Sequence, residues 1–323
     1  MQMFILDTDP GIDDAHALCM AVQARGAQLA AVTTVAGNVG VQQTTANALF
    51  LLAELAAVVP VFAGAAAPLT EPFHGAPEIH GADGLGLVQR RPVRAKAEDL
   101  TAADAIVTLA RARPGEVTLV ALGPLTNLAL ALQQAPELPD LVHRCIVMGG
   151  AIQARGNFTP VAEFNIASDP EAAKIVFSAW PGLTLVPWEA VQDMPVTETE
   201  AEQLIVGPGR AADLIRRINA AHRQNVGFLD EGGSLLFPDP AAMAVALDAT
   251  CIAERVAHAI RVELSGERRG ETQVDWLDNF SDLPKLEIVT RLNRDRTLEL
   301  IRLTVPEMAL NEVAGPVTLE HEP

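Results

Sequence analysis

The sequence predicts an α/β protein in which residues 1–323 form a single domain, with an open, mostly parallel, Rossmann-like sheet and helices on both faces. Over residues 1–190, short apolar runs typical of buried strands alternate with segments of helical periodicity. Polar clusters follow several of these runs, and in open parallel sheets ligands bind beyond the carboxyl ends of the strands. No repeat, low-complexity tract or linker divides the chain.

In the first half of the chain, apolar β-rich segments predict strands over residues 3–6, 29–35, 59–62, 117–122 and 142–148. Helical periodicity predicts helices over residues 15–25, 41–57, 102–112 and 124–134. Residues 64–98 are rich in glycine, proline and polar side chains, so we expect a long loop there. The regular alternation of strand and helix favours parallel pairing.

In the second half, Asp169-Pro170-Glu171 is a favourable helix start, because proline suits the first helical position. Further helices are predicted within residues 199–226, interrupted at Gly207-Pro208-Gly209, and over residues 239–247 and 295–303. Strands are predicted over residues 183–186, 256–264, 272–276 and 286–290, the second of them from strict alternation of apolar and polar residues. Residues 225–237 form a glycine-rich segment that we expect to be a mobile loop.

Composition excludes several classes of partner. The net charge is −18 and there is no block of lysine or arginine, which disfavours nucleic acid and anionic membranes as partners. The chain opens directly on a strand, without the regions of a signal peptide, and no apolar run is long enough to span a bilayer. Cys19, Cys145 and Cys251 lie far apart in apolar segments, as reduced core thiols do. We therefore expect a soluble, cytoplasmic protein.

The most informative stretch is Asp7-Thr8-Asp9-Pro10-Gly11-Ile12-Asp13-Asp14-Ala15, at the turn between the first strand and the first helix. Helix capping explains one or two of its aspartates. It does not explain four within eight residues, because like charges so close repel unless a cation lies among them. Oxygen ligands favour Ca²⁺ or Mg²⁺ over zinc, so the stretch predicts a metal site for a hard cation.

Four further motifs accompany the aspartate turn: residues 33–38 (TTVAGN), 121–127 (ALGPLTN), 147–165 from VMGG to AEFN, and Asp239-Pro240. Together with the aspartate turn they resemble the inosine-uridine preferring nucleoside hydrolases, over about residues 3–305. The resemblance implies the fold of that family, a small nucleoside as substrate and a homodimer or homotetramer. It implies hydrolysis of the N-glycosidic bond of ribonucleosides to ribose and free base.

The resemblance also implies roles for individual residues. Asp9, Asp14 and Asp239 would bind Ca²⁺ with the backbone carbonyl of Leu122, and Asp9 would act as base on a calcium-bound water. The residues that would hold the ribose hydroxyls are Asp13, Asn38, Met148 (through its backbone), Asn157, Glu163 and Asn165. This chemistry suits the residue types, because carboxylates and amide oxygens stabilise the positive charge that develops on the ribose ring.

The side of the site that would hold the base departs from the family pattern. Many family members place a histidine directly before the aspartate of the last motif, where it protonates the leaving base, but here that residue is Pro238. Two routes stay open: stacking by Trp188 or Trp276 could make the base basic enough for solvent to protonate it, or His80 could act as acid. Because tryptophan packs well on a flat bicyclic base, the sequence favours purine nucleosides.

Two other functions fit parts of the pattern. A Mg²⁺-dependent phosphatase that forms an aspartyl-phosphate also has Asp-x-Asp after its first strand, as Asp7-Thr8-Asp9 does. The second aspartate pair and the lack of an obvious lysine for the phosphate argue against it. A non-catalytic, calcium-dependent nucleoside- or sugar-binding protein is the other alternative, since Pro238 could have abolished turnover.

Two of the candidate residues also have purely structural explanations when each is taken alone. Asn38 is a residue type common in turns, and Asp239 is one common at helix N-caps.

Overall fold

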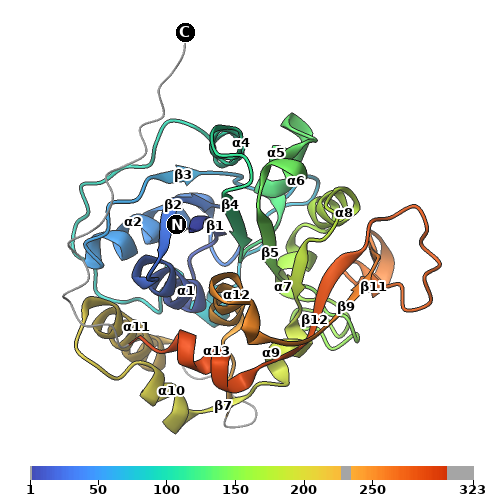
Figure 1. Cartoon of the computed structure of the whole chain (residues 1–323). Helices are drawn as coiled ribbons and strands as arrows, with labels where there is room; N and C mark the ends of the chain where they lie inside the picture. The colour runs from blue at the N-terminus through green and yellow to red at the C-terminus, as the bar shows by residue number, and fades with distance from the viewer. Residues whose placement is uncertain (1, 227–233, 304–323) are drawn as a thin grey trace.

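The computed structural model describes residues 2–226 and 234–303, which are organised around an eight-stranded sheet with strand order β3-β2-β1-β4-β5-β6-β12-β9 (Figure 1). All neighbouring pairs are parallel except β12 with β9. The strands are β1 (Gln2–Thr8), β2 (Ala27–Thr34), β3 (Val61–Ala63), β4 (Val117–Ala121), β5 (Arg144–Met148), β6 (Thr184–Val186), β9 (Ile252–His258) and β12 (Leu286–Leu292). The predicted mostly parallel α/β sheet is confirmed.

Helices cover both faces of this sheet, as expected (Figure 1). One face carries α1 (Ile12–Gln23), α2 (Val41–Glu54), α11 (Arg210–Asn225), α12 (Pro238–Leu247) and α13 (Arg294–Ile301). The other carries α4 (Ala102–Ala112), α5 (Thr126–Gln134) and α8 (Pro170–Ala179). Alternation along β1 divides its side chains between the two cores, since Phe4 and Leu6 pack into the first and Met3 and Ile5 into the second.

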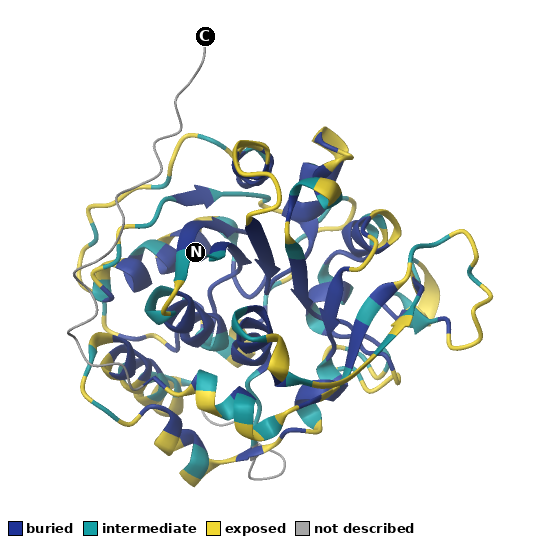
Figure 2. Ribbon diagram, in the orientation of Figure 1, coloured by how far each residue is buried: buried dark blue, intermediate teal, exposed yellow. Residues whose placement is uncertain are grey.

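The centre of the sheet is more buried than its β9 edge (Figure 2). The central strand β4 is buried throughout, whereas the edge strand β9 is mostly exposed. The three cysteines are buried free thiols, as predicted. Within the described ranges, no helix is long and apolar enough to cross a membrane.

The predicted strand over residues 256–264 is wrong in its extent. The chain leaves the main sheet after β9, and β10 (Ile260–Val262) pairs instead with β11 (Thr272–Val274) in a separate hairpin. Alternation continues across Ala259, and a period of two residues carries no information about which partner a strand has.

Several short elements were not predicted, because four or five residues are too few to show a period. They are α3 (Pro77–His80), α6 (Leu138–Leu141), α7 (Phe164–Ser168) and α9 (Trp188–Gln192). Two-residue strands β7 (Val196–Thr197) and β8 (Ser234–Leu235) pair beside α10 (Glu198–Leu204). Most of the predicted glycine-rich loop, residues 227–233, lies outside the described residues. The assignment of residues 1–323 to one domain stays a prediction.

Asn127, at the start of α5, joins the ends of the strands that carry the polar motifs. Its fully buried amide donates to Asp7 Oδ1 at 2.8 Å and to the Thr34 carbonyl at 3.0 Å, and its oxygen accepts from the Ala65 amide at 2.9 Å. One side chain therefore connects β1, β2 and the loop after β3. Buried polar groups that lose such partners are costly.

We expect Asn127→Ala to lower the free energy of unfolding by about 3–5 kcal/mol, because it leaves two buried polar groups and one half-buried amide without this partner. Urea unfolding followed by circular dichroism measures the change. The matched control is Asn279→Ala, at an exposed position, which should stay within about 0.5 kcal/mol of the parent. Similar losses for both variants would contradict the role assigned to Asn127.

Candidate active site

The aspartate turn lies between β1 and α1, as the sequence predicts. Asp14 caps α1: its Oδ2 accepts from the Gly11 amide at 2.9 Å, and its Oδ1 accepts from the Thr8 hydroxyl. The side-chain amide of Asn38 also donates, through Nδ2, to Asp14 Oδ2 at 3.1 Å. The N-terminus of a helix favours negative charge, so the turn holds an ionised Asp14 in a fixed orientation.

Asp9 is enclosed by the ends of two neighbouring strands. Its Oδ2 accepts from the Asn38 backbone amide at 2.6 Å, and its buried Oδ1 has no hydrogen-bond partner in the described part of the chain. A Cβ atom on Gly37 would lie 2.0 Å from Oδ2, and one on Gly123 would lie 2.5 Å from Oδ1. Glycine is required at both positions because the backbone approaches this carboxylate so closely.

Asp13, Asp14 and Asp239 form a cluster whose carboxylate oxygens all lie within 4.8 Å of one another. Burial raises the pKa of Asp14 to about 6, with a further contribution from the charge of Asp13. Burial, together with the charges of Asp13, Asp14 and Asp9, raises the pKa of Asp239 well above its usual range. Buried carboxylates held this close favour a bound cation, so the cluster could hold a metal ion.

This cluster differs in one member from the predicted ligand set. Asp14 and Asp239 belong to both, but Asp13 takes the third place in the cluster and Asp9 lies beside it, near enough for their charges to interact. The unpartnered oxygens Asp9 Oδ1 and Asp13 Oδ1 are both buried. Either is suited to a cation, since a buried carboxylate oxygen without a donor is costly.

A polar network fixes the loop that follows β5. Asn165 Nδ2 donates to the Leu122 carbonyl at 2.7 Å and to the Met148 carbonyl at 3.3 Å. Glu163 caps α7, accepting from the amides of Asn165 at 2.9 Å and Gly150 at 2.8 Å. Burial raises the pKa of Glu163 to about 7. The predicted residues of the loop are thus brought together with the ends of β4 and β5.

A cavity of about 970 Å³ opens above this network. The predicted site residues that line it are Asp13, Asn38, His80, Leu122, Met148, Asn157, Glu163, Asn165, Trp188 and Asp239. Asp9 and Asp14 lie beneath it, each 1 % exposed. The carboxyl ends of the strands therefore gather the predicted residues, as open parallel sheets do.

Trp276 is the exception among the predicted residues. It follows β11, is 48 % exposed, and contacts the ring of His258 edge-on at 5.3 Å between centroids. It does not line the cavity. The structure does not bring Trp276 together with the other predicted residues, because β10 and β11 pair in a separate hairpin outside the main sheet.

Glu189 and Pro238 take structural positions at the edge of the cavity. Glu189 accepts from the backbone amides of Ile152 at 2.9 Å and Gln153 at 2.7 Å, which ties the start of α9 to the loop after β5. Pro238 lines the cavity as the first residue of α12 and offers no ionisable group. Asn157, in the same loop, accepts from the Phe164 amide at 2.8 Å.

His80 is held in one neutral form. Its Nδ1 accepts from the Ile12 amide at 3.2 Å, so the hydrogen of the neutral ring lies on Nε2. Burial lowers the pKa of His80 to about 4, and Asp13 Oδ1 lies 3.9 Å from Nδ1. The ring can donate a hydrogen bond into the cavity, but a charged His80 would lose the bond from Ile12.

Sequence reasoning missed the wall of the cavity that α10 and α11 supply. Its polar members on α11 are Asn219, His222 and Arg223, at spacing i, i+3, i+4. That spacing places them on one face of a helix and was the available signal. Ile79 and Phe164, from α3 and α7, were missed because those helices are too short to show a period.

Comparison with known proteins agrees with this geometry. The family model "Inosine-uridine preferring nucleoside hydrolase" matches residues 4–299. A curated relative from Salmonella paratyphi B, named non-specific ribonucleoside hydrolase RihC, is 48 % identical over 187 residues, which cover 56 % of this chain. The chain spans 58 % of the length of that relative.

Two solved structures share the fold over most of the chain. The plant nucleoside hydrolase PpNRh1 superposes with a TM-score of 0.86 at 31 % identity, over 93 % of this chain and 98 % of that one. A purine-preferring ribonucleoside hydrolase from Gardnerella vaginalis superposes with a TM-score of 0.82 at 29 % identity, over 93 % and 97 %.

We expect Asp239→Asn to change stability in opposite directions with and without a cation. In EDTA it removes like-charge repulsion from the cluster, which should raise the melting temperature by about 2 °C, the effect of about 1 kcal/mol in a protein of this size. When calcium, magnesium or manganese is added back separately, the parent should gain stability and the variant should gain little.

Differential scanning fluorimetry measures both effects without an activity assay. The control is Asp282→Asn, whose partner Arg261 is an exposed surface contact, and which should leave both responses unchanged. A variant at position 239 that melts lower than the parent in EDTA, or that responds equally to added cation, would contradict a metal site at this cluster.

Proposed function

The chain belongs to the inosine-uridine preferring nucleoside hydrolase family, and from that membership we propose that it hydrolyses the N-glycosidic bond of ribonucleosides to ribose and free base. The observation that carries the proposal is the buried aspartate cluster at the floor of a cavity whose loop residues are amides and carboxylates. Positive charge develops on the ribose ring in this reaction, and such a floor is arranged to stabilise it before the reaction begins.

Asp9, Asp14, Asp239 and the Leu122 carbonyl would hold the metal ion, which we propose to be Ca²⁺. The donor set supports this, since every donor is an oxygen and Asp9 Oδ1 has no protein partner among the described residues. When bound, the ion would lower the pKa of a water and orient vicinal hydroxyls. Asp9, as the buried carboxylate below the cavity, would take the proton from the attacking water.

The ribose would lie over the polar loop. The groups that would hold its hydroxyls are Asp13, Asn38, the Met148 backbone, Asn157, Glu163 and Asn165. Glu163 and Asn165 are fixed by backbone hydrogen bonds before any ligand binds, so little reorganisation accompanies binding.

For the oligomeric state, we propose the homodimer or homotetramer that the sequence resemblance implies.

Trp188 is the aromatic side chain we propose to stack on the base. It lines the cavity at the start of α9, and a tryptophan offers a flat surface to a bicyclic ring. We therefore propose a preference for purine nucleosides. His80 would donate a hydrogen bond from Nε2 rather than a proton, because its Nδ1 is engaged by Ile12.

The phosphatase alternative finds no support at this site. Among the residues that the structure describes, no lysine lines the cavity, and the aspartate cluster would repel a phosphate group. A binding protein without turnover would keep the same geometry, so an assay of base release separates it from an enzyme.

We expect the protein to release free base from inosine, adenosine and guanosine faster than from uridine and cytidine, and to release no phosphate from p-nitrophenyl phosphate or nucleoside monophosphates. Chromatography of the bases and a colorimetric phosphate assay measure the two products. Phosphate release without base release would establish the phosphatase, and nucleoside binding without base release would establish the binding protein.

The control for this panel is exhaustive treatment with EGTA, which should abolish base release, followed by added calcium, which should restore it. Full activity after chelation, or recovery with zinc alone, would contradict the proposed calcium site.

We expect Asp9→Asn to lower kcat by at least about 10³-fold, because it removes both a general base and a metal ligand. Asp7→Asn is the matched comparison, since Asp7 is buried two residues earlier, in β1, but accepts from Thr33 at 2.6 Å and from Asn127 at 2.8 Å. Its loss should cost far less. Steady-state kinetics with inosine measures both, and equal losses would show that the two roles are exchanged.

A further inference from the structure

Residues 76–90 carry His80 to the cavity and pack directly against the aspartate turn. The Ile12 amide donates to His80 Nδ1 at 3.2 Å. A Cβ atom on Gly84, whose φ is +80°, would lie 3.2 Å from the Pro10 carbonyl oxygen, so a glycine is needed for this approach. The place of the His80 ring therefore depends on how this segment is held against the turn.

Asn47, on α2, hydrogen-bonds to both sides of this contact. Its fully buried side chain donates through Nδ2 to the Pro10 carbonyl at 2.8 Å and to the Asp83 carbonyl at 2.9 Å. Its Oδ1 accepts from Arg90 Nη1 at 2.6 Å and from Gln43 Nε2 at 2.8 Å. A side-chain amide has two hydrogens to donate and two lone pairs on its oxygen, so protein groups occupy all four. The side chain has no capacity left for a ligand, and any role it has in the site is one of position.

The turn after His80 is closed by its own hydrogen bonds. Asp83 Oδ1 accepts from the backbone amides of Leu85 and Leu87, each at 2.9 Å. The Gly86 amide donates to the His80 carbonyl at 2.9 Å. Aspartate side chains commonly close turns on their own backbone in this way. His80 and the turn therefore form one unit, and a bond to the Asp83 carbonyl fixes the position of that unit.

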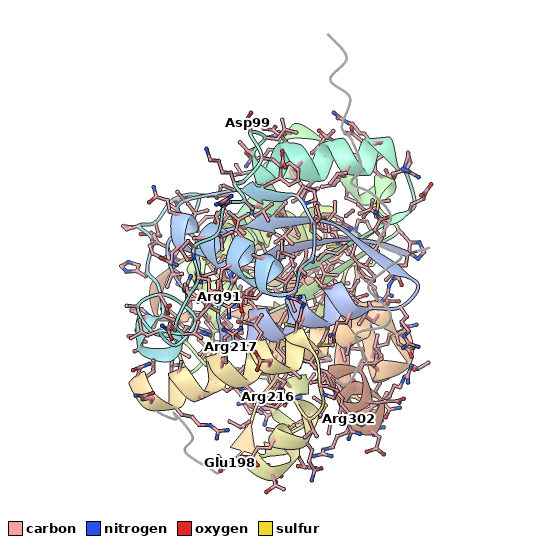
Figure 3. All side chains as sticks on the ribbon, turned by 90° about the vertical axis from the view of Figure 1, so that its left-hand side faces the viewer. Arg91, Asp99, Glu198, Arg216, Arg217 and Arg302 are labelled. Carbon is pink, nitrogen blue, oxygen red and sulfur yellow. The ribbon has the colours of Figure 1, made fainter. Side chains whose placement is uncertain are left out.

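Helix α2 gives Asn47 a fixed support. Arg217 of α11, labelled in Figure 3, forms an ion pair with Glu54 at the end of α2. Arg90 packs over the buried Phe50 ring, 5.3 Å from its centre, in addition to its bond with Asn47. Asn47 is thus presented by a helix that packs into the core and is tied to a second helix. A site residue held from a regular element is placed more precisely than one held from a loop.

We propose that Asn47 is a positioning residue for the reaction: its amide holds the turn after His80 against the aspartate turn, so that the His80 ring keeps its place in the cavity wall. This inference rests on the proposed function, in which His80 donates a hydrogen bond to the base. The aspartate turn has bonds of its own, from Gly11 to Asp14 at 2.9 Å among them. Loss of Asn47 should therefore displace the His80 side of the contact rather than the aspartates.

The first test follows backbone hydrogen exchange in the full chain by mass spectrometry, and it needs no substrate. Asn47→Asp keeps an oxygen for both donors but loses the hydrogens given to the two carbonyls. We expect peptides that cover residues 76–88 to exchange at least about tenfold faster than in the parent, with the rest of the chain unchanged. No change in these peptides, or an equal increase along the whole chain, would overturn the proposal.

The second test asks by kinetics whether Asn47 acts through His80. With calcium present, we expect Asn47→Asp and His80→Ala each to lower kcat for inosine by about tenfold, the effect of one lost hydrogen bond. Because both changes affect the same contact, the double variant should lie within about threefold of His80→Ala alone. A merely structural role would multiply the two losses, to about a hundredfold. Multiplied losses, or an unchanged kcat in either single variant, would contradict the proposal.

Two further variants separate the lost donors from other effects. Asn47→Ala removes the same donors without adding a charge, and it should repeat both results; parent-like behaviour would overturn the proposal. The matched control is Gln43→Ala, which removes a bond to Asn47 Oδ1 from within α2 and leaves both donated bonds in place. It should leave exchange and kcat within about twofold of the parent, and losses equal to those of Asn47→Asp would count against the proposal.

The two measurements also distinguish this proposal from the proposed function. A parent chain that releases no base from any nucleoside would overturn the proposed function, and with it the role of Asn47 in a reaction. The exchange measurement would still decide whether Asn47 holds residues 76–88 against the aspartate turn.

Discussion

Repulsion among buried carboxylates is the constraint on which the rest of this structure depends. Asp13, Asp14 and Asp239 come from two helices, α1 and α12, whose N-terminal ends meet below one cavity. The helix start favours their negative charge, but burial and proximity oppose it and raise their pKa values. A bound cation would offset both the burial and the mutual repulsion of these carboxylates. The cluster is therefore suited to a cation.

The surrounding polar network holds the site in place without any ligand. Asn127 joins β1 and β2, Glu163 and Asn165 join the loop after β5 to the ends of β4 and β5, and Glu189 ties α9 to that loop. Each of these side chains bonds mostly to backbone, which fixes where the chain runs. The cavity above them therefore has an acidic floor, which suits a positively charged group, and a wall on α11 that carries imidazole and amide groups.

The sequence alone determined the architecture where the pattern was long and regular. Alternating strands and helices predicted the parallel sheet and its covered faces, and the polar motifs at the strand ends predicted the polar residues of the cavity floor. The failures have physical causes. Helices of four or five residues are too short to show a period, and alternation cannot distinguish β9 in the main sheet from β10 in its own hairpin.

Motif spacing also determined which residues gather at the aspartate turn, because neighbours in a strand–turn–helix unit stay neighbours in space. Only the tertiary structure decided which distant side chains join them. It moved Trp276 away with β11, brought His222 to the cavity beside His80, and placed Asp13 in the cluster with Asp239. Those positions depend on how helices pack across the sheet and on which carbonyl or amide each ring nitrogen meets. Neither can be read from local periodicity. The sequence by itself therefore determined the carboxylates and amides at the floor of the cavity, whereas only the tertiary structure decided which side chains of α11 form its wall.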